Sequence, residues 1–106
     1  MKIAITAEGD NLDAPVDHRF GRCPYFIIYD SETGEFEAIE NTAAQARGGA
    51  GTQSAQLMAE KNVEVLLTGA VGPNAERGLS ALGVRVVTGV EGSTVRDVLN
   101  QFLKNS

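Results

Sequence analysis

The sequence has no tryptophan, one cysteine and few aromatic residues. The single cysteine, Cys23, cannot form an internal disulfide, and it suits a reducing compartment. No apolar stretch approaches the roughly 18 residues that a membrane-spanning helix needs. The beginning of the chain, residues 2–6, is typical of a strand and not of the apolar stretch and cleavage site of a signal peptide. These absences predict a cytoplasmic protein, with no membrane as its partner.

The chain also lacks an excess of basic residues. It carries nine Lys and Arg against fourteen Asp and Glu, which gives a net charge of -5. Binding to nucleic acid depends on clustered cations that neutralise phosphates, so nucleic acid is not the expected main partner. With 106 residues, 42% of them hydrophobic, the chain can bury one core, and residues 1–106 are expected to form a single domain.

The first half of the sequence is typical of strands. Residues 2–6 and 25–30 are rich in apolar and β-branched side chains, and residues 36–39 alternate apolar with acidic ones. Residues 31–34 end in Gly34, which fits a hairpin turn. Three strands, the last two joined by a hairpin, are therefore predicted.

The second half alternates strands with helices. Strands are predicted at residues 63–68 and 84–88, and helices at residues 52–61, 73–82 and 94–103. Thr52 is the expected N-cap of the first of these helices, and Asn62 its C-terminal cap. Pro73 is expected to open the second helix, and Gly83 to end it.

Strands joined by helices pair in parallel through right-handed crossovers, whereas the hairpin is antiparallel. The predicted fold is therefore α/β, with the order βββαβαβα. It forms a single-domain mixed five-stranded sheet with flanking helices, in a ribonuclease H-like architecture. The fold alone does not define a function.

Four loops are expected to share one edge of this sheet. They comprise residues 7–24, 41–51, 69–72 and 89–93, and they hold the one histidine, the one cysteine, three arginines and most of the glycines. Ligands of open α/β sheets bind outside the carboxyl ends of the parallel strands. The sequence therefore predicts a ligand site at this edge.

The first candidate within the site is a glycine-rich segment. Arg47, Gly48, Gly49, Gly51 and Thr52 combine a cation and free backbone amides at the start of a helix, an arrangement that binds anions. The segment is not a P-loop, because the Gly-Lys-Ser/Thr ending is absent. The alternative is a flexible linker.

The second candidate lies in the first loop. His18 and Cys23 can ligate a soft or borderline metal, and Arg19 and Arg22 can hold an anionic group. Two soft ligands are too few for a zinc site or for an iron-sulfur cluster held by protein alone, but they suffice for a preassembled cluster. The alternatives are a packed Cys23 and a solvent-facing His18.

Two further expectations concern the same loop. Phe20 is expected to anchor it in the core. The acidic residues Glu8, Asp10, Asp13 and Asp17 do not follow the spacing of an EF-hand, and they are expected to be solvated loop charges.

A resemblance to a known family rests on the run VDHRFGRCPYF at residues 16–26, on Tyr29-Asp30 and Glu40-Asn41, on the glycine-rich helix entry and on the strand-Thr-Gly-helix second half. In these features the chain resembles the dinitrogenase iron-molybdenum cofactor-binding domain family, of the NifX and NifB C-terminal type. Members often carry His directly before Phe-Gly. Here Arg19 occupies that place, and His18 lies one residue earlier.

The resemblance implies a ribonuclease H-like fold and a carrier, not an enzyme, for iron-molybdenum cofactor or a related precursor. Cluster-assembly proteins would be its partners. Three alternatives remain open: a nuclease, for which residues 2–6 lack the needed carboxylate; a small-anion-binding regulatory module; and a protein-interaction domain without metal. The sequence leaves the oligomeric state open.

Overall fold

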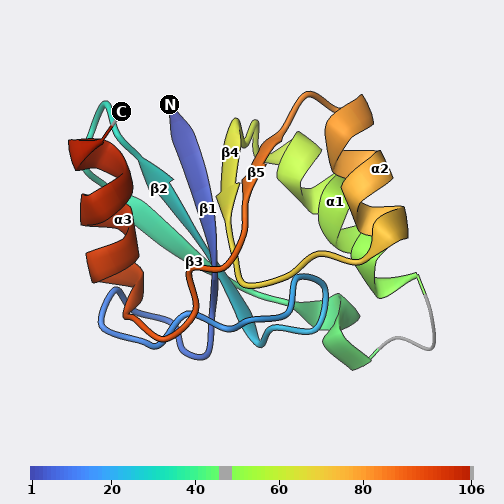
Figure 1. Ribbon diagram of the computed structural model, residues 1–106, viewed down its shortest axis with the longest axis horizontal. Helices are drawn as coiled ribbons and strands as arrows, with labels where there is room; N and C mark the ends of the chain where they lie inside the picture. The colour runs from blue at the N-terminus through green and yellow to red at the C-terminus, as the bar shows by residue number, and fades with distance from the viewer. Residues whose placement is uncertain (46–48, 106) are drawn as a thin grey trace.

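The computed structural model describes residues 1–45 and 49–105 (Figure 1). Within these residues the elements are β1 (Lys2–Ala7), β2 (Tyr25–Asp30), β3 (Phe36–Glu40), the 3-10 helix η1 (Thr42–Gln45), α1 (Ala50–Glu60), β4 (Val65–Leu67), α2 (Pro73–Ala81), β5 (Arg85–Val87) and α3 (Val95–Lys104). The 3-10 helix was not predicted.

The strands form one sheet in the order β3-β2-β1-β4-β5. Strand β2 is antiparallel to β1 and β3, whereas β1, β4 and β5 are mutually parallel. The predicted mixed five-stranded sheet is thus confirmed, with β1 at its centre and β5 at one edge.

The helices cover the two faces of the sheet unequally. Helices α1 and α2 lie on one face, and α3 lies alone on the other (Figure 1). Because side chains alternate along a strand, Ala4 and Leu66 pack towards α1 and α2 with Met58, whereas Ile5 packs towards α3 with Leu99. The protein therefore has one apolar core on each side of the sheet.

The start of α1 differs from the prediction. The helix begins at Ala50, and its N-cap is Gly49, with a φ of 75° and no side-chain cap. Thr52 is consequently the third residue of the helix, so its assignment as N-cap is wrong. Glycine reaches this left-handed conformation without steric cost, which lets the helix begin two residues earlier.

The other predicted helix ends are confirmed. Asn62 has a φ of 58° and donates its N–H to the carbonyl of Ala59 (3.1 Å), closing α1. Pro73 opens α2, and Gly83, with a φ of 78°, follows its end. Thr94 caps α3 by accepting the N–H of Asp97 at Oγ1 (3.1 Å).

Strand β5 is shorter than the predicted strand at residues 84–88, and it is partly exposed. It spans Arg85–Val87, with Arg85 exposed and the two valines half-buried, because it has a neighbour on one side alone. No helix in residues 1–45 and 49–105 is long and apolar enough to cross a membrane.

Candidate functional site

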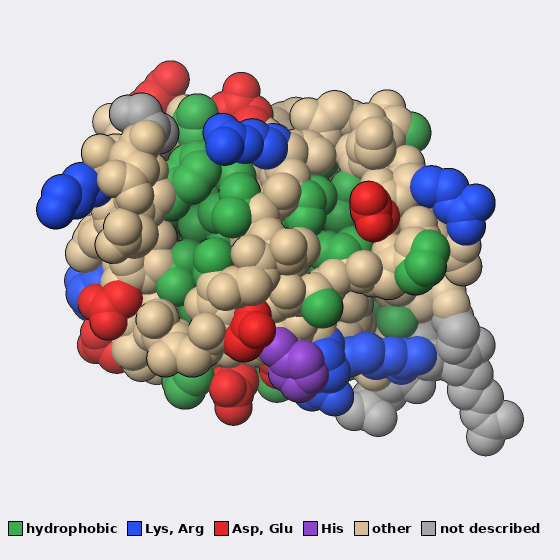
Figure 2. Space-filling view, viewed as in Figure 1, with side chains coloured by type: hydrophobic (Ala, Val, Ile, Leu, Met, Phe, Trp, Pro, Cys, Tyr) green, Lys and Arg blue, Asp and Glu red, His purple; other side chains and the backbone are tan. Residues whose placement is uncertain are grey.

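The carboxyl edge of the sheet gathers the loops that follow β1, β3, β4 and β5. We use this name for residues 8–24, 41–45, 69–72 and 88–94, which lie at the lower side of Figure 1. Figure 2 shows the His side chain at this edge, with Lys or Arg side chains on one side of it and acidic side chains on the other. The strand directions thus bring the predicted loops together.

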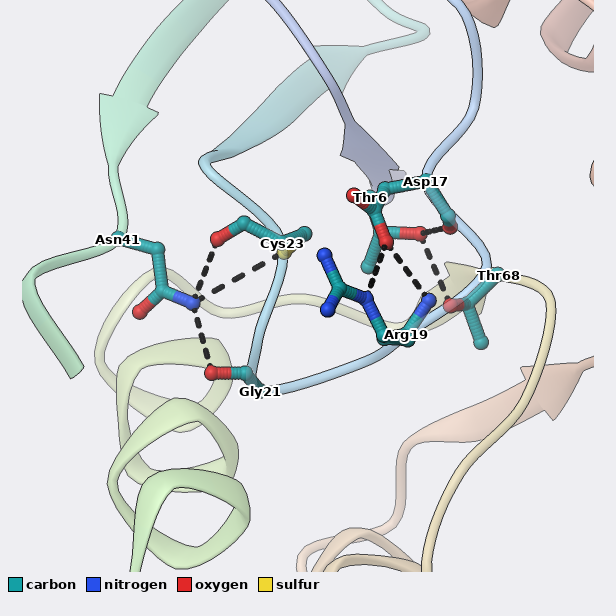
Figure 3. Close-up of polar contacts among 7 residues, drawn as sticks. All are labelled: Thr6, Asp17, Arg19, Gly21, Cys23, Asn41 and Thr68. Atoms are coloured by element: carbon teal, nitrogen blue, oxygen red, sulfur yellow. Dashed lines mark hydrogen bonds and ion pairs between the residues drawn. The ribbon is translucent and has the colours of Figure 1, made fainter. Parts of the chain in front are cut away.

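Two buried threonines fix the first of these loops. Thr6 is the last residue but one of β1, Thr68 follows β4, and both are fully buried. Thr6 Oγ1 donates to the carbonyl of Asp17 (2.6 Å) and lies 2.8 Å from Thr68 Oγ1 (Figure 3). The Thr6 hydroxyl has one hydrogen, which it donates to Asp17, so Thr68 is the donor in the hydrogen bond between the two hydroxyls. This clamp turns residues 8–24 back over the strand ends.

We expect Thr6→Val to lower the free energy of unfolding by about 2 kcal/mol, because it leaves two buried polar groups without their partner at nearly constant volume. Urea denaturation measures the change. Thr88→Val, at an exposed position of the same edge, is the control, and its expected effect is within about 0.5 kcal/mol. Equal effects for the two variants would contradict the clamp.

Asp17 is buried, so its prediction as a solvated loop charge is wrong. Its Oδ1 accepts the backbone N–H of Arg19 (2.8 Å) and lies 3.4 Å from Arg19 Nε. The side chain of Asp17 is 6% exposed, whereas that of Arg19 is 53% exposed. A buried carboxylate thus orients an arginine that reaches the surface.

A short β-bridge holds the His18 segment against the end of β4. Ala70 donates its N–H to the carbonyl of His18 (2.6 Å) and accepts the N–H of Phe20 at its own carbonyl (3.1 Å). Phe20 is buried, with its ring centroid 5.6 Å from that of Phe26, so the predicted anchor is confirmed. The bridge leaves the side chains of His18 and Arg19 exposed.

Gly69 lies where two loops of the edge approach each other. A Cβ at this position would come within 2.5 Å of His18 Cα and 2.7 Å of Glu91 Oε2. The N–H of Gly89 donates to the carbonyl of Gly69 (2.9 Å). Glu91 therefore lies beside the His18 segment, a proximity that the sequence analysis missed.

Cys23 lies in the core, which favours the packed alternative over a metal ligand. Its side chain is fully buried, and Asn41 Nδ2 donates to the carbonyls of Gly21 (3.0 Å) and Cys23 (2.9 Å) (Figure 3). Burial, reinforced by the negative charge of Asp17, raises the pKa of the Cys23 thiol to about 12. Metals bind thiolates, so this thiol is a poor ligand in the conformation observed.

The raised pKa predicts a pH dependence of stability. Below the pKa of the thiol in the unfolded state, near 9, Cys23 is neutral in both the folded and the unfolded protein, and its contribution to stability is fully present. As the pH rises from 9 towards 12, the Cys23 thiol loses its proton in the unfolded protein before it does so in the folded protein, so the free energy of unfolding falls. We expect denaturant titrations at pH 8 and pH 11 to show a larger loss for the parent than for Cys23→Ala. An equal loss would contradict the buried thiol.

The glycine-rich segment is described only in part. Arg47 and Gly48 lie outside the described residues. Gly51 has a packing role, because a Cβ there would come within 2.9 Å of Ala75 Cβ on α2. Gly51 and the exposed Thr52 lie in the first turn of α1. The backbone N–H groups of a first turn have no acceptor within the helix.

Arg22 joins the first loop to η1. Its Nη1 donates to the carbonyl of Ala44 (2.8 Å), and its side chain is exposed. Within residues 1–45 and 49–105, no group of three His, Cys, Asp or Glu side chains could hold a metal ion. Residues 18–22 thus offer two arginines and one imidazole, a set suited to an anion.

The edge and the sheet define an α/β domain in which a loop with the basic segment 18–22 is clamped over the carboxyl edge. The chain belongs to the dinitrogenase iron-molybdenum cofactor family, whose sequence profile matches residues 1–105. An uncharacterized protein of Methanocaldococcus jannaschii is 38% identical over 89 residues, which is 81% of this chain and 72% of that protein.

Two solved structures are also similar. The apo form of the orange protein from Desulfovibrio gigas has a TM-score of 0.94 and 44% identity, covering 98% of this chain and 88% of that one. A Thermotoga protein described as NifB, of the DUF35 family, has a TM-score of 0.85 and 42% identity, covering 97% and 87%.

Proposed function

We propose that the chain is a carrier for an anionic metal-sulfur cluster, either iron-molybdenum cofactor or a related precursor, in cofactor biosynthesis or trafficking. Residues 1–106 would act as one domain in the cytoplasm, with cluster-assembly proteins as partners. Family membership supports the type of ligand. The observation that carries the proposal is the exposed basic loop at residues 18–22, held in place by buried polar contacts.

The arginines would supply most of the affinity. The guanidinium of Arg19 contacts the buried carboxylate of Asp17 and reaches the surface. Arg22 lies on the same loop and donates to a carbonyl of η1. Charge-assisted hydrogen bonds from guanidinium groups suit the sulfide and oxo atoms of an anionic cluster. Arg47 and the amides of Gly48 and Gly49 would add to this set.

His18 would be the one exposed soft ligand. Its side chain is exposed on the segment bridged to Ala70, and its imidazole can ligate a borderline metal. Cys23 would coordinate a metal only after the loop opens, because its thiol is buried and protonated. A preassembled cluster, with its metals already bridged by sulfide, needs few protein ligands.

The role would be binding and not catalysis, in a ribonuclease H-like architecture. The strand order β3-β2-β1-β4-β5 with parallel β1, β4 and β5 supports that architecture. Nuclease chemistry with two metal ions needs convergent carboxylates. The middle of β1 carries Ala4 and Ile5 instead, and the carboxylate of Asp17 accepts the N–H of Arg19.

A second candidate is a small-anion-binding regulatory module. The buried, protonated Cys23 favours it, because this leaves His18 as the one exposed soft ligand of the pair predicted from the sequence. Such a module would bind phosphate or a carboxylate through the same arginines.

Thermal melts under anaerobic conditions distinguish the two candidates. Tetrathiomolybdate and inorganic phosphate are added at equal concentration and ionic strength. A carrier is stabilised more by tetrathiomolybdate and retains molybdenum after desalting, whereas a small-anion module is stabilised more by phosphate. The absence of any shift with either anion would contradict both candidates.

A further inference from the structure

Helix α3 leaves part of its face of the sheet uncovered. It packs over β1, where Val95 and Leu99 contact the core that contains Ile5. Between α3 and β5 lies a groove of about 420 Å³, visible as a hollow with exposed hydrophobic side chains in Figure 2. Its apolar lining includes Val87, Val90 and Phe102.

The groove runs beside the open edge of the sheet. The N–H of Arg85 donates to the backbone carbonyl of Glu64 (2.9 Å), and the carbonyl of Val87 accepts the N–H of Thr68 (3.0 Å). Residues of a parallel strand face their neighbour alternately, so the N–H and carbonyl of Val86 point to the open edge. This edge can pair with one more strand.

The groove carries two carboxylates and has a guanidinium at its apolar floor. Glu91 and Asp97 line it, and the guanidinium of Arg85 lies over the Phe102 ring, 5.7 Å from its centroid. The groove therefore combines an apolar floor, an open strand edge and two carboxylates. A segment with basic and apolar side chains is complementary to all three.

We propose that this groove docks an extended segment of a partner protein in which basic and apolar residues occupy every second position, so that both kinds of side chain face the groove. The backbone of the segment pairs with Val86, an apolar side chain packs on Val87 and Phe102, and basic side chains pair with Glu91 and Asp97. The proposal goes beyond the carrier function and does not depend on a bound cluster.

Docking in this groove would place the partner beside the candidate site. Glu91 lines the groove and also lies next to Gly69, against which the His18 segment packs. A docked segment that engages Glu91 thus contacts the same loop, residues 88–94, that borders the carboxyl edge.

The test is an NMR titration of the full chain, labelled with nitrogen-15, with capped hexapeptides. The probe has lysine and valine in turn at every second position with serine between them, and its counterpart has glutamate in place of lysine. We expect the lysine peptide to shift amides of β5, residues 88–94 and α3, and to bind at least about threefold more tightly than the glutamate peptide. A lysine peptide with N-methylated backbone amides should bind more weakly, because strand pairing is blocked.

A matched pair of variants tests the charges. Glu91→Gln with Asp97→Asn should abolish the preference for lysine, whereas Glu60→Gln with Glu76→Gln, the same charge change on exposed positions of α1 and α2, should preserve it. Shifts outside the groove, or equal binding of both peptides, would overturn the proposal. Concentration-dependent shifts of the same amides without peptide would instead identify a second copy of the chain as the occupant, which also overturns it.

Discussion

Gly69→Ala is expected to lower the free energy of unfolding by about 3 kcal/mol, at the upper end of the usual cost of overpacking. The added methyl group would lie 2.5 Å from His18 Cα and 2.6 Å from His18 Cβ. Neither neighbour is the free end of a flexible side chain. The His18 segment would therefore have to move away from Ala70, losing the bridge that holds it.

Gly72→Ala is the matched control for this substitution. A Cβ at Gly72 would meet no atom within 4 Å, and the residue lies three positions away in the same loop. Its expected effect is within about 1 kcal/mol. Urea denaturation compares the two variants, and NMR shifts of the amides of residues 17–20 show whether the segment moved. A Gly69→Ala variant as stable as Gly72→Ala would contradict the packing described.

Replacing Arg19 and Arg22 together with glutamine is expected to weaken tetrathiomolybdate binding tenfold or more. Loss of one charge-assisted hydrogen bond, worth roughly 1.5 to 3 kcal/mol, is sufficient for this effect. Both arginines lie on one exposed loop, and no other described loop of the carboxyl edge carries an arginine. Isothermal titration under anaerobic conditions measures the change.

The control for charge replaces Arg77 and Arg96 with glutamine. These side chains are exposed, belong to α2 and α3, and also make hydrogen bonds, to Asn74 and Asp13 respectively. The double control lowers the net charge by the same amount, so a general electrostatic effect would weaken binding equally in both variants. Equal affinities of the two double variants would refute the role of the loop arginines.

Much of the fold follows from local sequence signals. The apolar strands, Pro73 at the start of α2, Gly83 after its end and Thr94 at the start of α3 each act over a few residues, and the structure confirms them. Asn41 carried a local signal for η1 that was overlooked. Its Oδ1 accepts the N–H of Ala43 (3.1 Å), as in an Asx turn.

The candidate site depended on contacts distant in sequence. Thr6 reaches Asp17 across eleven positions and Thr68 across 62, so a local reading placed Asp17 among solvated charges. Likewise, the burial of Cys23 depends on how the loop folds over the core. The sequence was sufficient to predict that the exposed His18 and the two arginines of the loop lie at the edge. It was not sufficient to predict that Asp17 orients Arg19 or that Glu91 lies beside the His18 segment.

The most direct test of the carrier function is anaerobic loading with a molybdenum-iron-sulfur cluster, followed by gel filtration and metal analysis of each fraction. The proposed function predicts that molybdenum and iron elute with the protein, and that the Arg19→Gln and Arg22→Gln double variant loses most of this metal while remaining folded. Elution of all metal in the small-molecule fractions with the parent protein would contradict it.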